Sequence, residues 1–80
     1  MDKIDALLTE RGKTYGDAVL THSRIAEVWS GILQHEVSPY EVALCMAGLK
    51  LVRANVNPDH TDSLDDALGY TRIAQSILGP

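Results

Sequence analysis

The sequence predicts an all-α fold, a small antiparallel four-helix bundle completed by homo-oligomerisation. Apolar residues recur at helical spacing in four segments, and no segment alternates as a strand would. One of these segments, Val42–Leu49, contains no charged or amide side chain. We expect one domain, residues 1–80, and a domain this small buries only about 60% of the surface of its unfolded chain. Such an apolar helix in so small a domain favours a homodimer that packs the third helix against its mate.

The first expected helix runs from about Asp2 to Arg11, and Gly12 is placed to end it. The second covers about Asp17 to His35. Its apolar residues are spaced by four and three in turn, which is typical of a helix that packs nearly antiparallel to a neighbour. They are Ala18, His22, Ile25, Trp29 and Ile32.

The third expected helix extends from Pro39 to about Asn55, and three signals agree on its start. Ser38 suits the N-cap, Pro39 suits the first helical position, and Glu41 completes a capping box with Ser38. The helix ends near Asn55 because Asn57-Pro58 cannot continue it.

The fourth expected helix starts at Ser63-Leu64-Asp65-Asp66, again with the spacing of a capping box. Gly79-Pro80 ends it. Its spacing predicts one apolar face, bordered by two isoleucines. The residues expected on this face are Leu64, Ala67, Leu68, Thr71, Ala74 and Leu78.

Composition disfavours several functional classes. The net charge is −4 and the chain has only seven basic residues, so generic nucleic-acid binding is not expected. The N-terminus has no signal-peptide pattern, and the apolar run is shorter than the roughly 20 residues that span a bilayer. Cys45 is the only cysteine, which fits a reducing compartment. We therefore expect a cytoplasmic protein that binds neither nucleic acid nor membrane.

Cations near two helix ends form a candidate site for a small phosphorylated ligand. Arg11, Lys13 and Tyr15 crowd the turn before the second helix, where backbone amides can also cradle an anion. Lys50 and Arg53 share a face of the third helix and are able to bind phosphate as a pair. The alternative is that these two cations stabilise the helix end and pair with aspartates of the next helix.

His22 belongs to the candidate ligand-binding residues because it sits within the apolar stripe of the second helix. It suits a metal or a phosphate near the bundle centre. It equally suits a core-edge position where its ring nitrogens reach a backbone carbonyl or a carboxylate. Both interpretations remain open at the level of sequence.

Glu41, Asp62 and Asp66 are the candidate metal ligands. Carboxylates from facing helices can hold Mg²⁺, which prefers oxygen ligands and water. Each also has a structural explanation, since Glu41 and Asp66 have the spacing of capping boxes and Asp62 lies at a helix start. No nucleophile pair, P-loop, GxGxxG, CxxC or HExxH motif is present, so no catalytic residue is assigned.

Four stretches carry a resemblance to a known family. They are ERGKTYGD (10–17), HSRIAEVW (22–29), EVALCMAGLKLVR (41–53) and NPDHTDSLDDALGY (57–70). Together they resemble a group of short all-α proteins of unknown function from tailed bacteriophages, especially those of actinobacteria. The resemblance covers nearly the whole chain, and it implies a phage-type accessory protein without an agreed activity.

A more distant resemblance links the chain to the MazG-type nucleoside triphosphate pyrophosphohydrolases. Those enzymes are oligomeric helical bundles that hold Mg²⁺ with an ExxE motif and an ExxD motif. Asp62-Ser63-Leu64-Asp65 is similar to a weak ExxD, and no ExxE is present. Two hypotheses follow: a non-catalytic homo-oligomer that binds a nucleotide-like ligand or a host protein, and, as the alternative, a minimal Mg²⁺-dependent pyrophosphohydrolase.

Overall fold

The computed structural model describes residues 15–79, and their side chains from residue 17 onward. It contains three α-helices in this range: α2 (Tyr15–Leu33), α3 (Pro39–Val56) and α4 (Asp62–Leu78). No strand occurs among the described residues, so the predicted all-α class is confirmed. The first expected helix, about residues 2–11, lies outside the described residues, and the four-helix count stays a prediction.

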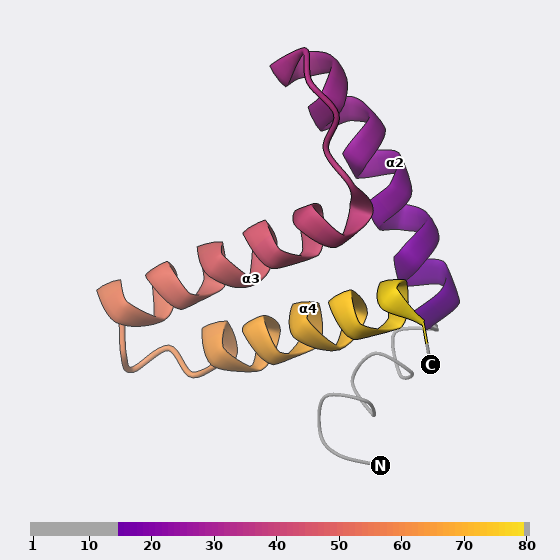
Figure 1. Cartoon of the computed structure of the whole chain (residues 1–80). Helices are drawn as coiled ribbons and strands as arrows, with labels where there is room; N and C mark the ends of the chain where they lie inside the picture. The colour runs from indigo at the N-terminus through magenta and orange to yellow at the C-terminus, as the bar shows by residue number, and fades with distance from the viewer. Residues whose placement is uncertain (1–14, 80) are drawn as a thin grey trace.

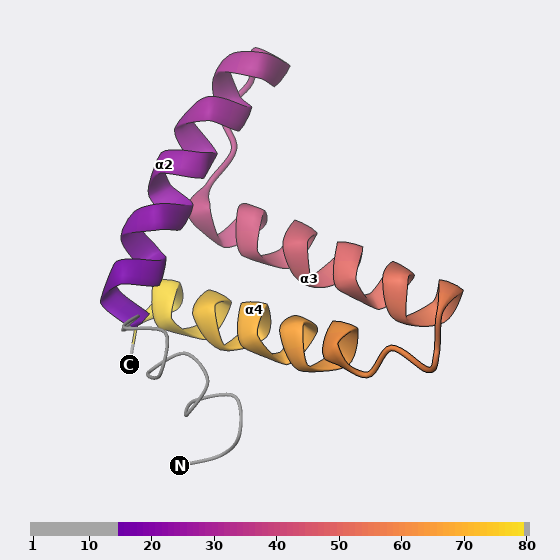
Figure 2. The ribbon, with the colours of Figure 1, turned by 180° about the vertical axis from the view of Figure 1, so that it is seen from behind.

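The helices α3 and α4 form an antiparallel hairpin, with α2 crossing one end of it (Figure 1). The view from behind gives the same arrangement (Figure 2). The N-terminal half of α2 contacts the hairpin, whereas its C-terminal half projects away from it (Figure 1). None of the described helices combines the length and apolar character that a membrane span requires.

The start of α3 is determined locally, as predicted. The Ser38 hydroxyl accepts a hydrogen bond from the Glu41 amide at 3.1 Å, and the Ser38 amide donates to Glu41 Oε1 at 2.9 Å. Pro39 occupies the first helical position, where no backbone donor is required. This reciprocal pair is the predicted capping box, and it explains why α3 begins where the sequence indicates.

The predicted capping box of α4 is wrong. The helix begins at Asp62, and its N-cap, Thr61, makes no side-chain hydrogen bond to the helix. Overlapping turns lead into the helix instead, since the Ser63 amide donates to the His60 carbonyl and the Leu64 amide donates to the Thr61 carbonyl. Ser63 is therefore already inside the first turn and buried.

The connection from α2 to α3 is held by backbone and side-chain bonds. Gln34 adopts a left-handed conformation with a φ of 56°, and the His35 amide reaches back to the Ser30 carbonyl at 3.2 Å. This is the geometry of a Schellman C-cap, here without the usual glycine. The Ser30 hydroxyl also accepts from the Val37 amide at 2.8 Å and donates to the Val37 carbonyl at 3.3 Å.

The core of the described chain is built mainly from small residues. Val42 is the only large side chain with no solvent exposure within the described range. The central cluster combines residues of all three helices, with Tyr40, Tyr70 and Ile77 packed against it. Its members are Ala18, Ala43, Ile73 and Ala74.

Two predicted core faces differ from the structure. The expected face of α4 is rotated, because Leu64, Leu68 and Leu78 are exposed while Ile73 is buried. On α2 the predicted stripe is core only in its first half, and Ile32 is 73% exposed. The spacing identifies an apolar helix face correctly, but it does not say whether a neighbour covers that face.

Candidate functional site

His22 lies in the core where α2 meets the hairpin, and only 5% of its surface is exposed. Its Nδ1 lies 2.8 Å from the Ala18 carbonyl oxygen. Because a carbonyl can only accept, Nδ1 is the donor in this bond, and in the neutral ring Nε2 is then the acceptor. This contact is the structural alternative considered for His22, in which a ring nitrogen reaches a backbone carbonyl.

The second ring nitrogen of His22 has no hydrogen-bond partner among the described residues, although it is buried. The ring instead packs against Tyr70, with 5.9 Å between ring centroids and a tilt of 59°. A buried polar atom without a hydrogen-bond partner is uncommon, because leaving it unpaired costs about 1–3 kcal/mol. This atom is the least satisfied polar group of the described core.

Lys50 and Asp66 form an ion pair between α3 and α4, with 3.0 Å between Nζ and Oδ2. Both side chains are half-buried. This contact is the structural alternative considered for Lys50, which pairs with an aspartate of the next helix. Arg53 lies one turn further along α3 and is exposed.

Glu41 is exposed at the start of α3, where its carboxylate belongs to the capping box. The hydrogen bond from the Ser38 amide lowers the pKa of this carboxyl, aided by the Ser38 hydroxyl and by His35 nearby. These contacts favour the charged form of the side chain. Glu41 thus has a complete structural role.

The three candidate metal ligands are distributed along the hairpin. Because α3 and α4 are antiparallel, Glu41 at the start of α3 lies near the end of α4, while Asp62 opens α4 at the opposite end (Figure 1). Asp66 is held by Lys50. In the part of the chain that the structure describes, no group of three or more His, Cys, Asp or Glu side chains is placed to hold a metal ion.

Two members of the predicted anion site, Arg11 and Lys13, lie outside the described residues, as does the side chain of Tyr15. Among the rest, His22 belongs to α2 and to the core, whereas Lys50 and Arg53 belong to the distal half of α3. The described structure therefore does not gather these three residues at one place. The set stays a prediction.

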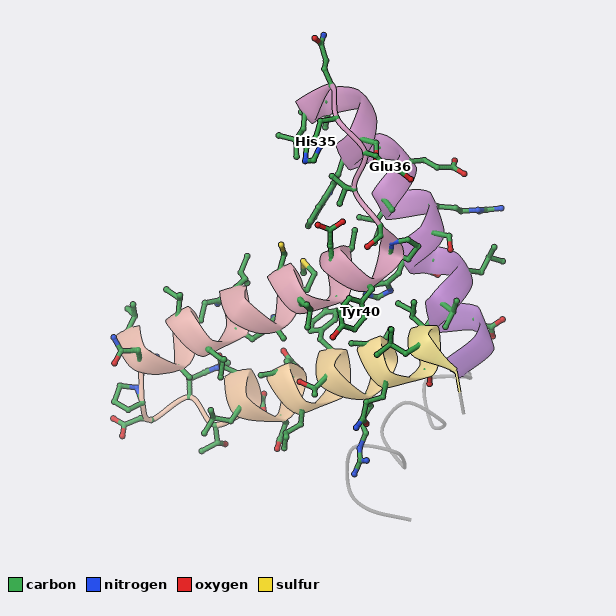
Figure 3. The ribbon with its side chains drawn as sticks, viewed as in Figure 1. His35, Glu36 and Tyr40 are labelled. Atoms are coloured by element: carbon green, nitrogen blue, oxygen red, sulfur yellow. The ribbon has the colours of Figure 1, made fainter. Side chains whose placement is uncertain are left out.

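Sequence reasoning missed the contribution of the α2–α3 connection and of Tyr40. Figure 3 shows His35 and Glu36 on the connection and Tyr40 where the three helices meet. His35 acts on the Glu41 carboxyl, and Tyr40 packs against the core cluster. The position of Tyr40 just after the Ser38-Pro39 start was the signal that could have found it.

The largest unexplained feature of the described surface is its content of big aliphatic side chains. On α3 they are Leu44, Leu49, Leu51, Val52 and Val56, and on the projecting half of α2 they are Val28, Ile32 and Leu33. Cys45 is exposed among the former. Isolated exposed leucines are ordinary, but apolar residues gathered on one helix mark an interaction surface.

Comparison with known proteins places the chain in a family. Residues 1–78 match the domain of unknown function DUF6378. The chain is 35% identical over 72 residues to the Gene 55 protein of Mycobacterium phage L5, covering 89% of this chain and 46% of the relative. It is 35% identical over 68 residues to the Gene 55 protein of Mycobacterium phage D29, covering 85% and 45%.

The chain thus spans about half the length of these relatives, at 46% and 45%. No solved structure matches it. The expected kinship with a family of phage proteins of unknown function is confirmed by the two mycobacteriophage relatives and by the family match. The chain belongs to the DUF6378 family.

Proposed function

We propose that the chain is a non-catalytic phage-type accessory protein that acts by binding, as a homo-oligomer in the host cytoplasm. A single observation supports this most strongly. The interior of the described chain is made mostly of alanine, with Val42 and Ile73, while twelve larger leucine, isoleucine and valine side chains are exposed. An oligomer reverses this distribution by burying the large residues between chains.

The energetic reason lies in the size of the exposed side chains. Full burial of one leucine, isoleucine or valine contributes about 1.5–3 kcal/mol relative to leaving it exposed. An alanine core supplies much less per residue, and a domain of this size has little stability in reserve. Association that covers several of the large residues on α2 and α3 would therefore stabilise the described helices.

The geometry supports binding over catalysis. A pyrophosphohydrolase of the MazG type needs several carboxylates around Mg²⁺, which bridges phosphate oxygens and positions the attacking water. In this chain Glu41 caps α3, Asp66 pairs with Lys50, and Asp62 lies at the far end of the hairpin from Glu41. The enzyme alternative requires these three carboxylates to lie around one Mg²⁺ ion.

A phosphorylated ligand, such as a nucleotide, is the second candidate for what the oligomer binds; the first is a host protein. One observation bears on it: Nε2 of His22 is buried without a partner among the described residues, and in the neutral ring it would accept a hydrogen bond from a base or sugar group of a nucleotide. Arg53 is exposed on α3, apart from His22 on α2. Binding at Lys50 would compete with its ion pair to Asp66, which makes this candidate the weaker one.

Two measurements on the purified chain test these alternatives. Light scattering coupled to size exclusion should give a mass of two or more chains, and a monomer at every concentration would overturn the proposed oligomer. Incubation with Mg²⁺ and a nucleotide panel, followed by ultrafiltration and chromatography, should leave all nucleotides unconverted. Release of a nucleoside monophosphate that Asp66→Ala abolishes would establish the enzyme alternative. An intact nucleotide retained with the protein would establish the second candidate.

A further inference from the structure

We propose that two copies of the chain associate by packing α3 against α3 in antiparallel orientation, about a two-fold axis near Gly48. The contact is a stripe of small and aliphatic residues, exposed except for the half-buried Gly48, and is here called the α3 stripe. It consists of Leu44, Cys45, Gly48, Leu49, Val52 and Val56. This interface rests on the homo-oligomer proposed above and identifies which surface forms it.

The two sides of α3 carry different kinds of residue. Ala43 and Ala47 are buried, and Lys50 pairs with Asp66, so this side of α3 faces α4. Successive residues of a helix are rotated by roughly 100°, which places the α3 stripe on the side away from α4. The stripe is free of charge along its length, unlike the surface of an ordinary solvated helix. The only partner that the described chain offers α3 on this side is the projecting half of α2.

Gly48 lies in the middle of the α3 stripe, and the described residues offer no explanation for it. A methyl group added there would meet no atom of the described residues within 4 Å beyond its own helix backbone. Glycine is a poor helix former, and its backbone conformation here is ordinary helix, which alanine adopts more readily. A close approach of a second backbone explains the missing side chain, and a two-fold axis near this residue places the two glycines at the crossing.

Charges at the two ends of α3 favour the antiparallel arrangement. Glu41 is exposed in the first turn, and Arg53 is exposed in the last. In an antiparallel pair each Glu41 lies beside the Arg53 end of the mate, and the contact occurs twice. The helix dipoles also oppose each other. A parallel pair would instead align like charges.

The α3 stripe has six residues, whereas a stable interface buries about 800 Å² and roughly 20–30 residues on each partner. The projecting half of α2 supplies the additional surface. It rises on the side of α3 that faces away from α4 (Figure 1), and it exposes Ile32 and Leu33 there. A second copy seated on the α3 stripe lies next to these residues and covers them.

The lone thiol provides a direct probe of this interface. Cys45 is the only cysteine of the chain and is exposed in one copy. Its rate of reaction with a maleimide is measured over a range of protein concentrations, alongside the mass by light scattering. We expect the rate to fall at least tenfold as the dimer forms. A dimer in which Cys45 reacts at the monomer rate would overturn the α3 interface.

Matched charge substitutions locate the surface. Val52 on the α3 stripe is 65% exposed, and Leu68, which lies on α4 and outside the stripe, is 55% exposed. Val52→Glu should give a monomer with a fast, concentration-independent thiol reaction, while Leu68→Glu should remain a dimer. The reverse pattern, with Leu68→Glu monomeric and Val52→Glu dimeric, would overturn the α3 interface but leave the homo-oligomer intact. A wild-type chain that is monomeric throughout would overturn both.

Gly48→Gln guards against an unfolded variant, since glutamine is a better helix former than glycine. Its helix content by circular dichroism should match or exceed that of the wild type, yet the dimer should be lost. A dimer of undiminished affinity would show that no close approach occurs at Gly48 and would overturn the two-fold axis placed there.

Discussion

The two halves of α2 carry one continuous apolar stripe but lie in different surroundings. In the first half, Ala18, His22 and Ala26 are buried against the hairpin. In the second half the helix projects beyond α3, and Ile32 and Leu33 expose most of their surface (Figure 1). Nothing in the spacing distinguishes the halves. The difference teaches that an apolar stripe marks a helix face that is favourable to bury. The tertiary arrangement decides which part of that face is buried by the same chain.

The sharpest test of this comparison places the same charge in each half. Ala26→Asp introduces a carboxylate into the interior and should lower the free energy of unfolding by about 3 kcal/mol or more. Ile32→Asp should change it by no more than about 0.5 kcal/mol in dilute, monomeric protein. Urea denaturation followed by circular dichroism measures both. Equal losses would mean that the second half is also covered within one chain.

A second substitution asks what holds the projecting half in place. Ser30→Ala removes the two hydrogen bonds to Val37 that fix the α2–α3 connection alongside α2. We expect a loss of about 1 kcal/mol in the free energy of unfolding. Ser23→Ala is the matched control, because its hydroxyl bonds only to the Val19 carbonyl of its own helix, and it should cost less. If Ser23→Ala lowers the free energy of unfolding more than Ser30→Ala does, the bonds to Val37 have no special role in holding the connection.

A third substitution concerns the end of the projecting half. Gln34 has a φ of 56°, a region that glycine adopts more readily than glutamine. Gln34→Gly should therefore raise the free energy of unfolding by about 0.5 kcal/mol. Gln75→Gly, at an exposed position inside α4, should lower it by about 1 kcal/mol. Thermal unfolding of the two variants should shift in opposite directions, and shifts of the same sign would refute the left-handed cap.

The smallest effect is expected at Glu41, where the connection enters α3. Its pKa is lowered in the folded chain, so its stabilising contribution is present above the ordinary glutamate pKa of 4.5 and disappears as the pH falls through the lowered value. Glu41→Gln keeps a hydrogen-bonding side chain but removes the charge. The wild type should be the more stable at neutral pH, and the two melting temperatures should converge in acid. A constant difference would contradict the charge-assisted cap.

Local rules succeeded where the signal lies within a few residues. The start of α3 follows from Ser38, Pro39 and Glu41, and the structure shows the reciprocal hydrogen bonds that these residues predict. The same rules failed at α4, where Ser63 and Asp66 have identical spacing. There the backbone is already helical at Thr61, where the turn from Asn57 ends. Ser63 therefore lies inside the helix and makes no cap.

The candidate site shows the same division. The alternative that Lys50 pairs with an aspartate of the next helix followed from helix order, but only the hairpin register selected Asp66. The depth of His22 was expected from the α2 stripe, whereas its unpaired Nε2 depends on which side chains of α3 and α4 arrive beside it. The rotation of α4, which buries Ile73 and exposes Leu64 and Leu68, was likewise a matter of packing.

By itself the sequence determined the all-α class, the positions of three helices to within about two residues, and the capping of α3, because these depend on contacts between near neighbours. The tertiary structure alone decided which apolar faces are covered. Alanines at 43, 47, 67 and 74 let the helices approach closely, and the larger side chains were left outside as a consequence. A helix with more than one apolar face can pack through any of them, so its sequence alone does not select one. In this chain the helices pack through the faces that carry small residues.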